Sequence, residues 1–511
     1  MGFNITKGAN QYVSLSIILS FIIILLIPSS ILAQDEYEKW KQQQEAEFKE
    51  YRDKFDKEFV ELLEKTWEEV GIKEGAPSYK EKKPVEIPSA PPRPIVENKA
   101  PGDTPPIKDN ITIDIPEFVD TPPVKIDLPA EKSMFEGLNT QKTTINYFSS
   151  KIPLEYPTKL REFFSANEFV SSKTDNKKIA EFWDKVSSID HTPLIEYSQK
   201  VRGDLDLNDW GYVLLLNDIT NTIFEGYDSK LISLYNWFLL TKSGYKVRIG
   251  YDQNGVYNLF AVEYDVFNTK FYTLDNEKYY VIDLNEHKQT PSSIFTYTGT
   301  HKAQSKKLNL RITKLPNLGD SKSVEQRTLS FSFDEIDYEI PLSLDKNLIT
   351  YFEYFPLTEL PVFFTASLSE NSKNAIYKVL APAISEMSEE EAVNFLLRFV
   401  QTSFDYKTDQ DQFDREKYML PEETLFYPYS DCDDRSILFA NLVQELLKME
   451  VVGLRYSKHL ATAVLFSDNV EGDAHFHGGK KYIVADPTYI NANVGMTMSQ
   501  YKNEKPEIVS F

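Results

Sequence analysis

The sequence predicts an α+β fold, because helical segments and alternating strand segments both occur and are separated along the chain. Residues 388–400 open with a capping box, Ser388 followed by Glu391, and continue as an apolar helical pattern. Residues 329–333 alternate Leu-Ser-Phe-Ser-Phe, as does a strand with one buried face. Helices and antiparallel strands in separate stretches are typical of this fold class. Residues 308–312 alternate as well, and we expect antiparallel sheet across 308–355.

Short apolar segments recur in the same order, which indicates an internal duplication. Each set gives helix, helix, strand and strand. The matched pairs are 213–219 with 394–400, 247–251 with 452–456, and 278–283 with 481–486. We therefore expect residues 208–283 and 389–486 to share one fold.

Length and charge limit the kind of protein this is. The chain has 511 residues, of which 41% are hydrophobic and 13% aromatic, enough for two to four domains with sizeable cores. Its formal net charge is −22, and such a surface repels phosphate backbones. We therefore do not expect this protein to bind nucleic acid.

The N-terminus resembles an export signal. Lys7 precedes the apolar run 16–27, and small residues end it at Ala33, so we predict a signal peptide over 1–33. The alternative is an uncleaved anchor, because residues 13–33 are almost long enough to span a bilayer. Either way the folded part is expected outside the cytoplasm, periplasmic or secreted, without a stable membrane span once the signal is removed.

The rest of the chain divides by composition. We expect a charged amphipathic helix over 34–75, with a continuous helical pattern from 35 to 70, then a proline-rich, extended linker over 76–130. The three following parts are a degenerate, non-catalytic copy, a β-rich connecting region and the catalytic domain, over 131–300, 301–370 and 371–511 respectively.

The single cysteine, Cys432, is informative in an exported protein, where cysteines usually pair as disulfides. Ser430 or Asp431 is a suitable N-cap for the apolar stripe of residues 438, 442 and 446, which places Cys432 in the first turn of a helix. The helix dipole there favours thiolate, and free backbone N–H groups can hold an oxyanion. The pattern therefore indicates a nucleophilic thiol.

His459 and Asp486 complete a predicted triad. His459 opens the apolar strand 460–466 after a turn, and Asp486 ends the strand 482–485. In this arrangement Cys432 attacks an acyl carbon, His459 moves the proton, and Asp486 orients the imidazole.

The order of these residues, together with Asp431-Cys432-Asp433-Asp434 and Asp486-Pro487-Thr488, resembles the bacterial transglutaminase-like (transglutaminase/cysteine peptidase) superfamily over residues 388–489. The resemblance implies a papain/transglutaminase-like core, in which the nucleophile's helix packs on antiparallel sheet. It also implies amide hydrolysis or transamidation through a thioester. Family members often carry Gly before Asp-Cys, where this chain has Ser430. The family also needs a second oxyanion donor, for which Tyr427 and Tyr429 are the candidates.

The acidic residues around the thiol have two interpretations. Asp431, Asp433 and Asp434 suit a helix N-terminus, and as hard ligands they could alternatively hold Ca²⁺. We expect no required cofactor. The charges of Asp431, Asp433 and Asp434 raise the pKa of the Cys432 thiol, so we expect an ion pair between Cys432 and His459 to offset them. A further acidic group at 409, 411, 414 and 416 is expected to be a solvated loop.

Alignment of the two repeats places Tyr227 opposite Cys432, Asn254 opposite His459, and Asp283 opposite Asp486. The first copy would then lack both nucleophile and base. The leading function is an exported thiol enzyme acting on protein or peptide amides, with hydrolysis favoured over cross-linking. The alternative is a non-catalytic envelope scaffold or binding protein that retains the fold.

Overall fold

The computed structural model describes residues 31–65, 67–75, 83, 84, 86–91, 126, 127, 133–169, 174–282, 284, 291–319 and 323–511. The predicted signal sequence, most of the proline-rich segment and Asp283 lie outside these residues. Two compact units are present, 1–59 and 60–511. Among the described helices none is both long and apolar enough to cross a membrane.

The N-terminal helix α2 (Ile31–Leu63) is shorter than its sequence pattern suggested. It ends at Leu63, and Glu68–Gly71 forms strand β1 instead of continuing the helix to Val70. The reason is tertiary: β1 pairs antiparallel with β9 (Ser293–Thr296). Two of its large apolar side chains, Trp40 and Tyr51, are exposed.

The first helix-and-sheet region follows hairpin β3–β4 (Thr140–Tyr147, Ser150–Pro157). Helices α6 and α7 pack against each other, and α7 lies along strands β5 and β6. The sheet is antiparallel throughout, in the order β1-β9-β5-β6-β8-β7-β2. The helices are α3 (Lys159–Glu162), α4 (Asn176–Ser187), α5 (Thr192–Asp204), α6 (Asp209–Ile223) and α7 (Ser229–Lys242). The remaining strands are β2 (Lys73–Glu74), β5 (Val247–Tyr251), β6 (Val256–Ala261), β7 (Lys270–Leu274) and β8 (Glu277–Val281).

The connecting region is only partly β-structure. Hairpin β10–β11 (Val324–Phe333, Ile336–Asp345) contains the predicted strand 329–333, and Phe331 packs against Phe395 and Phe399. Residues 308–312 do not form the expected strand, since Leu308 makes only an isolated bridge and the backbone N–H of residue 309 bonds to a side chain. Three helices follow: α8 (Lys346–Glu353), α9 (Leu360–Phe364) and α10 (Glu370–Ile384).

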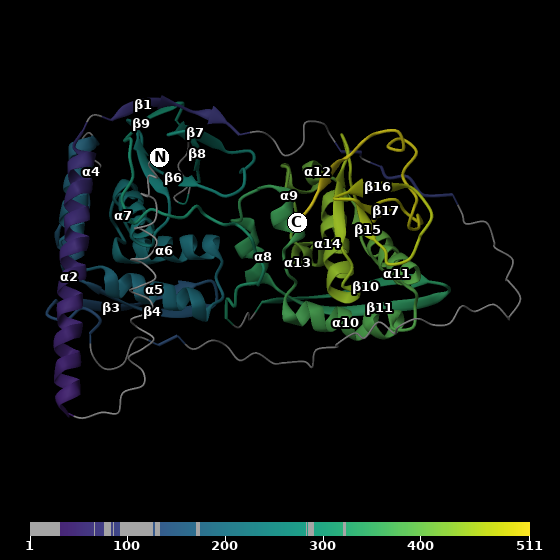
Figure 1. Ribbon diagram of the computed structural model, residues 1–511, viewed down its shortest axis with the longest axis horizontal. Coiled ribbons are helices and arrows are strands. Elements are labelled where there is room, and N and C mark those ends of the chain that lie inside the picture. Colours follow the sequence, from purple (N-terminus) through teal and green to yellow (C-terminus); the bar gives the residue numbers. More distant parts are fainter. Residues whose placement is uncertain are drawn as a thin grey trace, which may run out of the picture. The chain divides into compact units, whose positions relative to one another are not determined.

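The second helix-and-sheet region contains the predicted triad. Helix α11 (Glu389–Thr402) begins with the expected capping box, and helix α14 (Cys432–Leu442) packs along strand β15 (Figure 1). A π-helical turn over Val443–Leu447 extends α14. Between α11 and α14 lie β12 (Asp405–Tyr406), α12 (Asp409–Phe413), α13 (Pro421–Phe426) and β13 (Tyr429–Ser430). The sheet order is β16 (Ala474–His477), β17 (Lys480–Ala485), β15 (Leu460–Leu465), β14 (Val451–Arg455) and β18 (Glu507–Val509).

The two regions share their strand order. Reading β9-β5-β6-β8-β7 beside β18-β14-β15-β17-β16, each strand has a counterpart and every neighbour is antiparallel. The chain therefore holds two regions of the same helix-and-sheet order, and both are mixed helical and antiparallel.

The shared elements correct two of the expected correspondences. Tyr227 does not begin a helix: α7 begins at Ser229 after the N-cap Asp228, as α14 begins at Cys432 after the N-cap Asp431. The counterpart of Cys432 is therefore Ser229. Likewise, the β5–β6 turn spans 252–255 and the β14–β15 turn spans 456–459, so Gly255, and not Asn254, corresponds to His459.

Candidate functional site

The start of helix α14 places Cys432 as its first residue, as predicted. The Asp431 carboxylate accepts a hydrogen bond from the backbone N–H of Asp433 (3.1 Å), and the Asp434 carboxylate accepts one from the backbone N–H of Asp431 (2.9 Å). This reciprocal cap satisfies donors that a helix start leaves open. The Cys432 side chain is fully buried.

His459 and Asp486 form a buried pair. His459 ends the turn before β15, and its Nε2 lies 2.8 Å from Oδ2 of Asp486. The other carboxylate oxygen accepts from the backbone N–H groups of Thr488 (2.9 Å) and Tyr489 (3.2 Å), which fixes the carboxylate. The predicted contact between the two residues is present. Because Nε2 faces Asp486, Nδ1 is the ring nitrogen left for proton transfer.

The Cys432 sulfur lies at the start of the strand that follows His459. The backbone N–H of Leu460, the next residue, donates to the sulfur. The Tyr501 ring stacks on the imidazole of His459 with centroids 5.1 Å apart. Burial, and then the charge of Cys432, raise the pKa of the Tyr501 hydroxyl. The thiol itself donates to Oδ1 of Asp433 over 3.6 Å. The thiol thus lies against the first residue of β15, whereas no hydrogen bond or ion pair joins its sulfur to the His459 ring in the described part of the chain.

The electrostatics around the thiol differ from the expectation. Burial first, and then the carboxylates of Asp433 and Asp431, raise the pKa of Cys432 well above its usual value. The opposing charge that the structure supplies is the ammonium of Lys83, which lowers the thiol pKa. The offset expected from His459 is therefore provided at least in part by a lysine from the predicted linker.

Lys83 is buried within a ring of carboxylates. Its Nζ lies 2.6 Å from Asp433, 2.7 Å from Asp431, 2.9 Å from Glu416 and 3.1 Å from Asp409. Burial opposes the charge, but Asp431, Asp433 and Asp409 outweigh it and hold the pKa of Lys83 well above its usual value. We call these four carboxylates the acidic pocket. Nothing in the proline-rich composition around Lys83 indicated that this residue would be part of a core.

The structure corrects the expectation for Asp409 and favours the helix N-terminus interpretation of Asp434. Asp409 is buried and not part of a solvated loop, because it faces Lys83 and accepts from the backbone N–H of Lys417 (3.1 Å). Asp434 faces the backbone instead, accepting from Met419 (2.9 Å) as well as Asp431. Asp434 therefore caps helix α14 and holds the backbone of Met419. The sequence motif alone did not distinguish this role from that of a metal ligand.

Repulsion among the buried carboxyls is strong. Burial raises the pKa of Asp433 to about 6 against the pull of Lys83. Burial, and then the charge of Asp431, also raise the pKa of Asp409 and of Asp434 well above the usual value. In the described part of the chain, three overlapping groups have ligand atoms within 4.8 Å of one another: Asp431 with Cys432 and Asp433, Asp409 with Asp431 and Asp434, and Asp409 with Glu416 and Asp433. Such a cluster of hard oxygen ligands could hold a cation.

The predicted oxyanion tyrosines make contacts elsewhere. Tyr427 packs edge-on against Phe413, and Tyr429 is exposed beneath the ammonium of Lys407. The tyrosine beside the thiol is Tyr406, whose strand pairs with the residues just before α14. Burial first, then the charges of Cys432 and Asp431, raise its pKa. Pattern reasoning missed Tyr406 because it lies 26 positions from Cys432, outside the local motif.

Two buried polar side chains hold the site together. The Arg435 guanidinium, on α14, donates to Oγ of Ser430 (3.1 Å), to the carbonyl of Gln401 (3.3 Å) and to that of Phe404 (2.7 Å). The Gln401 amide in turn donates to the backbone carbonyl of Asp486 (3.1 Å). Helix α11, helix α14 and Asp486 are therefore linked by hydrogen bonds. Neither residue was identified from the sequence.

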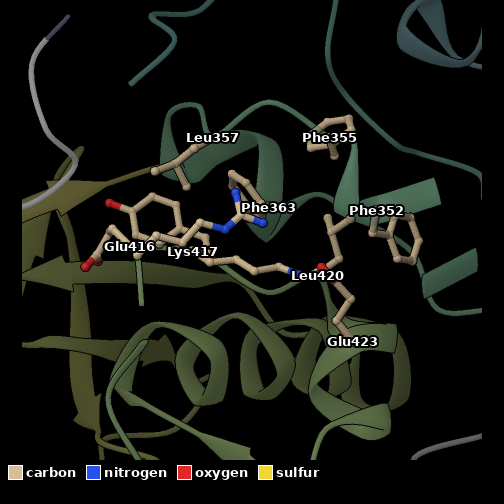
Figure 2. A pocket seen from close by; sticks show the side chains of 10 residues that line it. Phe352, Phe355, Leu357, Phe363, Glu416, Lys417, Leu420 and Glu423 are labelled. Carbon is tan, nitrogen blue, oxygen red and sulfur yellow. Dashed lines mark hydrogen bonds and ion pairs between the residues drawn. The ribbon is translucent and has the colours of Figure 1, made fainter. Parts of the chain in front are cut away.

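A small pocket adjoins the acidic pocket through Glu416. Figure 2 shows the Lys417 side chain extending toward Glu423, with which it forms an ion pair. The Glu416 side chain points away from Glu423. Burial raises the pKa of Glu423, and Lys417 opposes this. The segment 415–418 thus contributes one face to this pocket and the Glu416 carboxylate to the acidic pocket.

No protein-family model, no curated protein and no solved structure matches this chain.

Proposed function

We propose that residues 371–511 form a thiol-dependent acyl-transfer enzyme of transglutaminase-like type, with Cys432 as nucleophile, His459 as base and Asp486 as orienting carboxylate. The observation that carries this proposal is the buried His459–Asp486 pair beside the helix-starting thiol. A buried imidazole held by a fixed carboxylate has one nitrogen free to exchange a proton, as nucleophilic catalysis requires.

The proposed reaction passes through a thioester. Nδ1 of His459 takes the thiol proton, and the sulfur of Cys432 attacks an amide carbon of a protein or peptide. Backbone N–H groups at the start of α14 and the Tyr406 hydroxyl would stabilise the developing oxyanion. The imidazolium then gives its proton to the leaving amine. Water completes hydrolysis, which we favour, and a second amine would complete transamidation.

The thiol chemistry needs no cofactor. We propose Ca²⁺ only as an alternative occupant of the acidic pocket, held by carboxylate oxygens and competing with the Lys83 ammonium. We further propose that the protein acts outside the cytoplasm after signal removal, with anchoring by an uncleaved N-terminal helix as the alternative. The first helix-and-sheet region would be a duplicated, non-catalytic copy, supported by the shared strand order.

A second function is favoured by one observation. The Cys432 sulfur has no exposed surface, and its proton faces Asp433. A scaffold or binding protein that kept the fold without the activity would tolerate this arrangement. The two functions differ in whether the sulfur ever becomes acylated.

The test compares wild type with Cys432→Ala on a library of fluorogenic peptide amides and activated esters. Intact-mass spectrometry detects the thioester. We expect turnover to fall at least about 10³-fold in the variant, with Tm changed by only a few degrees. Retention of full activity in Cys432→Ala would refute the assignment. Absence of turnover and of any thioester in a wild type whose thiol is accessible to alkylation would favour the scaffold.

A further inference from the structure

Part of the proline-rich segment lies against the candidate site. We call the described residues Lys83, Pro84 and 86–91 the strap. At its start the Lys83 side chain fills the acidic pocket, and the carbonyl of Pro84 accepts a hydrogen bond from the Tyr406 hydroxyl (2.8 Å). Burial, and then the charge of Cys432, raise the pKa of the same hydroxyl. The strap therefore presents a peptide carbonyl to a donor beside the nucleophile.

Farther along, the strap forms one isolated β-bridge to the segment that follows β17. Ser89 pairs in parallel with Ile490, and the backbone N–H of Ala90 donates to the Ile490 carbonyl (2.7 Å). The Ala90 methyl group is buried in the apolar cluster that includes Tyr489 and Tyr501. Backbone pairing with an extended segment, plus pockets for selected side chains, is how proteins recognise extended peptides.

The acidic pocket suits a primary ammonium in particular. Four carboxylates converge within 3.1 Å of one nitrogen, and the Tyr418 ring lies 5.9 Å from that nitrogen. Lysine presents a compact charge with three donors, whereas the planar guanidinium of arginine needs a wider, flat partner surface.

We propose that the acidic pocket and the backbone of Ile490 form the binding site for an extended peptide bearing a lysine side chain, and that the strap occupies this site in cis as an inhibitor. The strap and the pocket come from distant parts of the chain, yet Lys83 is as deeply buried as a core residue. The binding part of the inference holds whether or not Cys432 is catalytic. The inhibitory part rests on the proposed function.

The physical consequence is a closed resting state. With the strap in place, the sulfur of Cys432 and the ring of His459 are buried, so no substrate reaches them. A lysine-bearing peptide must displace Lys83 to bind, and displacement exposes the thiol. Ligand recognition and access to Cys432 would then be one event.

The first experiment measures alkylation of the single cysteine by iodoacetamide at pH 8 in EDTA, which keeps divalent ions out of the pocket. In the full chain, Lys83→Ala should raise the alkylation rate at least about tenfold by releasing the strap. The matched control is Glu86→Ala, an exposed position on the same strap, which should react like wild type. An unchanged rate in folded Lys83→Ala overturns the inhibitory role.

A second variant guards against misfolding, because Lys83→Ala leaves buried carboxylates without their cation. Ala90→Asp places a charge in the apolar cluster and leaves the acidic pocket's own residues intact. It should release the strap and raise the alkylation rate similarly. If Ala90→Asp is folded by circular dichroism and its rate equals that of wild type, the strap does not close the site.

The lysine specificity is tested in trans. A labelled peptide with the sequence of residues 83–91 is titrated into the Cys432→Ala, Lys83→Ala double variant by fluorescence anisotropy. It should bind saturably, and binding to Cys432→Ala with its own Lys83 should be at least about tenfold weaker because the strap competes. A peptide with Gln in place of its lysine should fail to bind. Equal binding of both peptides would refute the lysine pocket.

These outcomes separate this inference from the proposed function. If the strap variants expose the thiol and the peptide binds, but no amide or ester is turned over, the enzyme proposal fails while the binding site stands. If wild type turns over substrate and the strap variants are no more reactive, the enzyme proposal stands and the strap inhibitor fails.

Discussion

The two helix-and-sheet regions have the same strand order but different chemistry at the start of the equivalent helix. Helix α7 starts with an exposed Ser229 after the cap Asp228. Helix α14 starts with the fully buried Cys432 after the cap Asp431. The cap geometry is a property of the helix and is common to both. The surroundings of the first helical residue differ between the two regions.

The difference lies in the segment before each helix. In the first region only residues 224–228 join α6 to α7, whereas 403–431 join α11 to α14. The longer segment supplies Tyr406, Asp409 and Glu416, which together surround Lys83 and the thiol. An insertion, more than the shared scaffold, therefore builds the candidate site.

The largest expected effect on thiol reactivity comes from moving the thiol to the other helix start. In a Cys432→Ala background, Ser229→Cys should give a thiol that iodoacetamide alkylates about 100-fold faster at pH 8 than Cys432 in wild type, because position 229 is exposed. The same variant should show no amide turnover, since Gly255 stands where His459 does.

The pH dependence sharpens this test. Burial, Asp433 and Asp431 raise the pKa of Cys432, so its alkylation rate should still be rising above pH 9. The rate at position 229 should level off near the ordinary thiol pKa of about 8.5. Turnover by the Ser229→Cys variant would show that the first region has a working site and would break the comparison.

The second prediction concerns the orienting carboxylate. Asp486→Asn keeps an acceptor for the backbone N–H groups of Thr488 and Tyr489 but disturbs the hydrogen bond to His459. Turnover in steady-state assays should fall by about 10³–10⁴-fold, with some activity remaining because the nucleophile is intact. Asp283→Asn, at the position that the sequence alignment places opposite Asp486, should leave turnover unchanged. Equal losses in the two variants would contradict a division into catalytic and inert regions.

The smallest effect is expected at the helix caps and is measured by Tm. Asp228→Ala should cost about 1 kcal/mol, the usual value of an N-cap, and lower Tm by about 2–4 °C. Asp431→Ala should lower it further, because Asp431 also forms an ion pair with the buried Lys83. Similar Tm losses would mean that the pairing with Lys83 adds nothing to the fold.

Much of the candidate site could be predicted because its parts are local. The cap at Asp431 and the helical spacing after it fix Cys432 at a helix start through interactions spanning a few residues. The turn before β15 likewise places His459 within its own hairpin. The prediction that failed for 308–312 shows the limit, since an alternating pattern cannot tell a paired strand from a segment whose backbone bonds to side chains.

The sequence by itself determined the mixed α and β class, the capped helix that begins at Cys432, and the partnership of His459 with Asp486. The fold class and the capped helix follow from hydrogen bonds and periodicity over short stretches. The pairing of His459 with Asp486 follows from the order of Cys432, His459 and Asp486 along the chain. Only the tertiary structure decided that Lys83 would fill the acidic pocket and that Asp409 would be buried beside it. These contacts join residues more than 300 positions apart. They depend on desolvated charges finding one another, and no local pattern of the chain encodes that pairing.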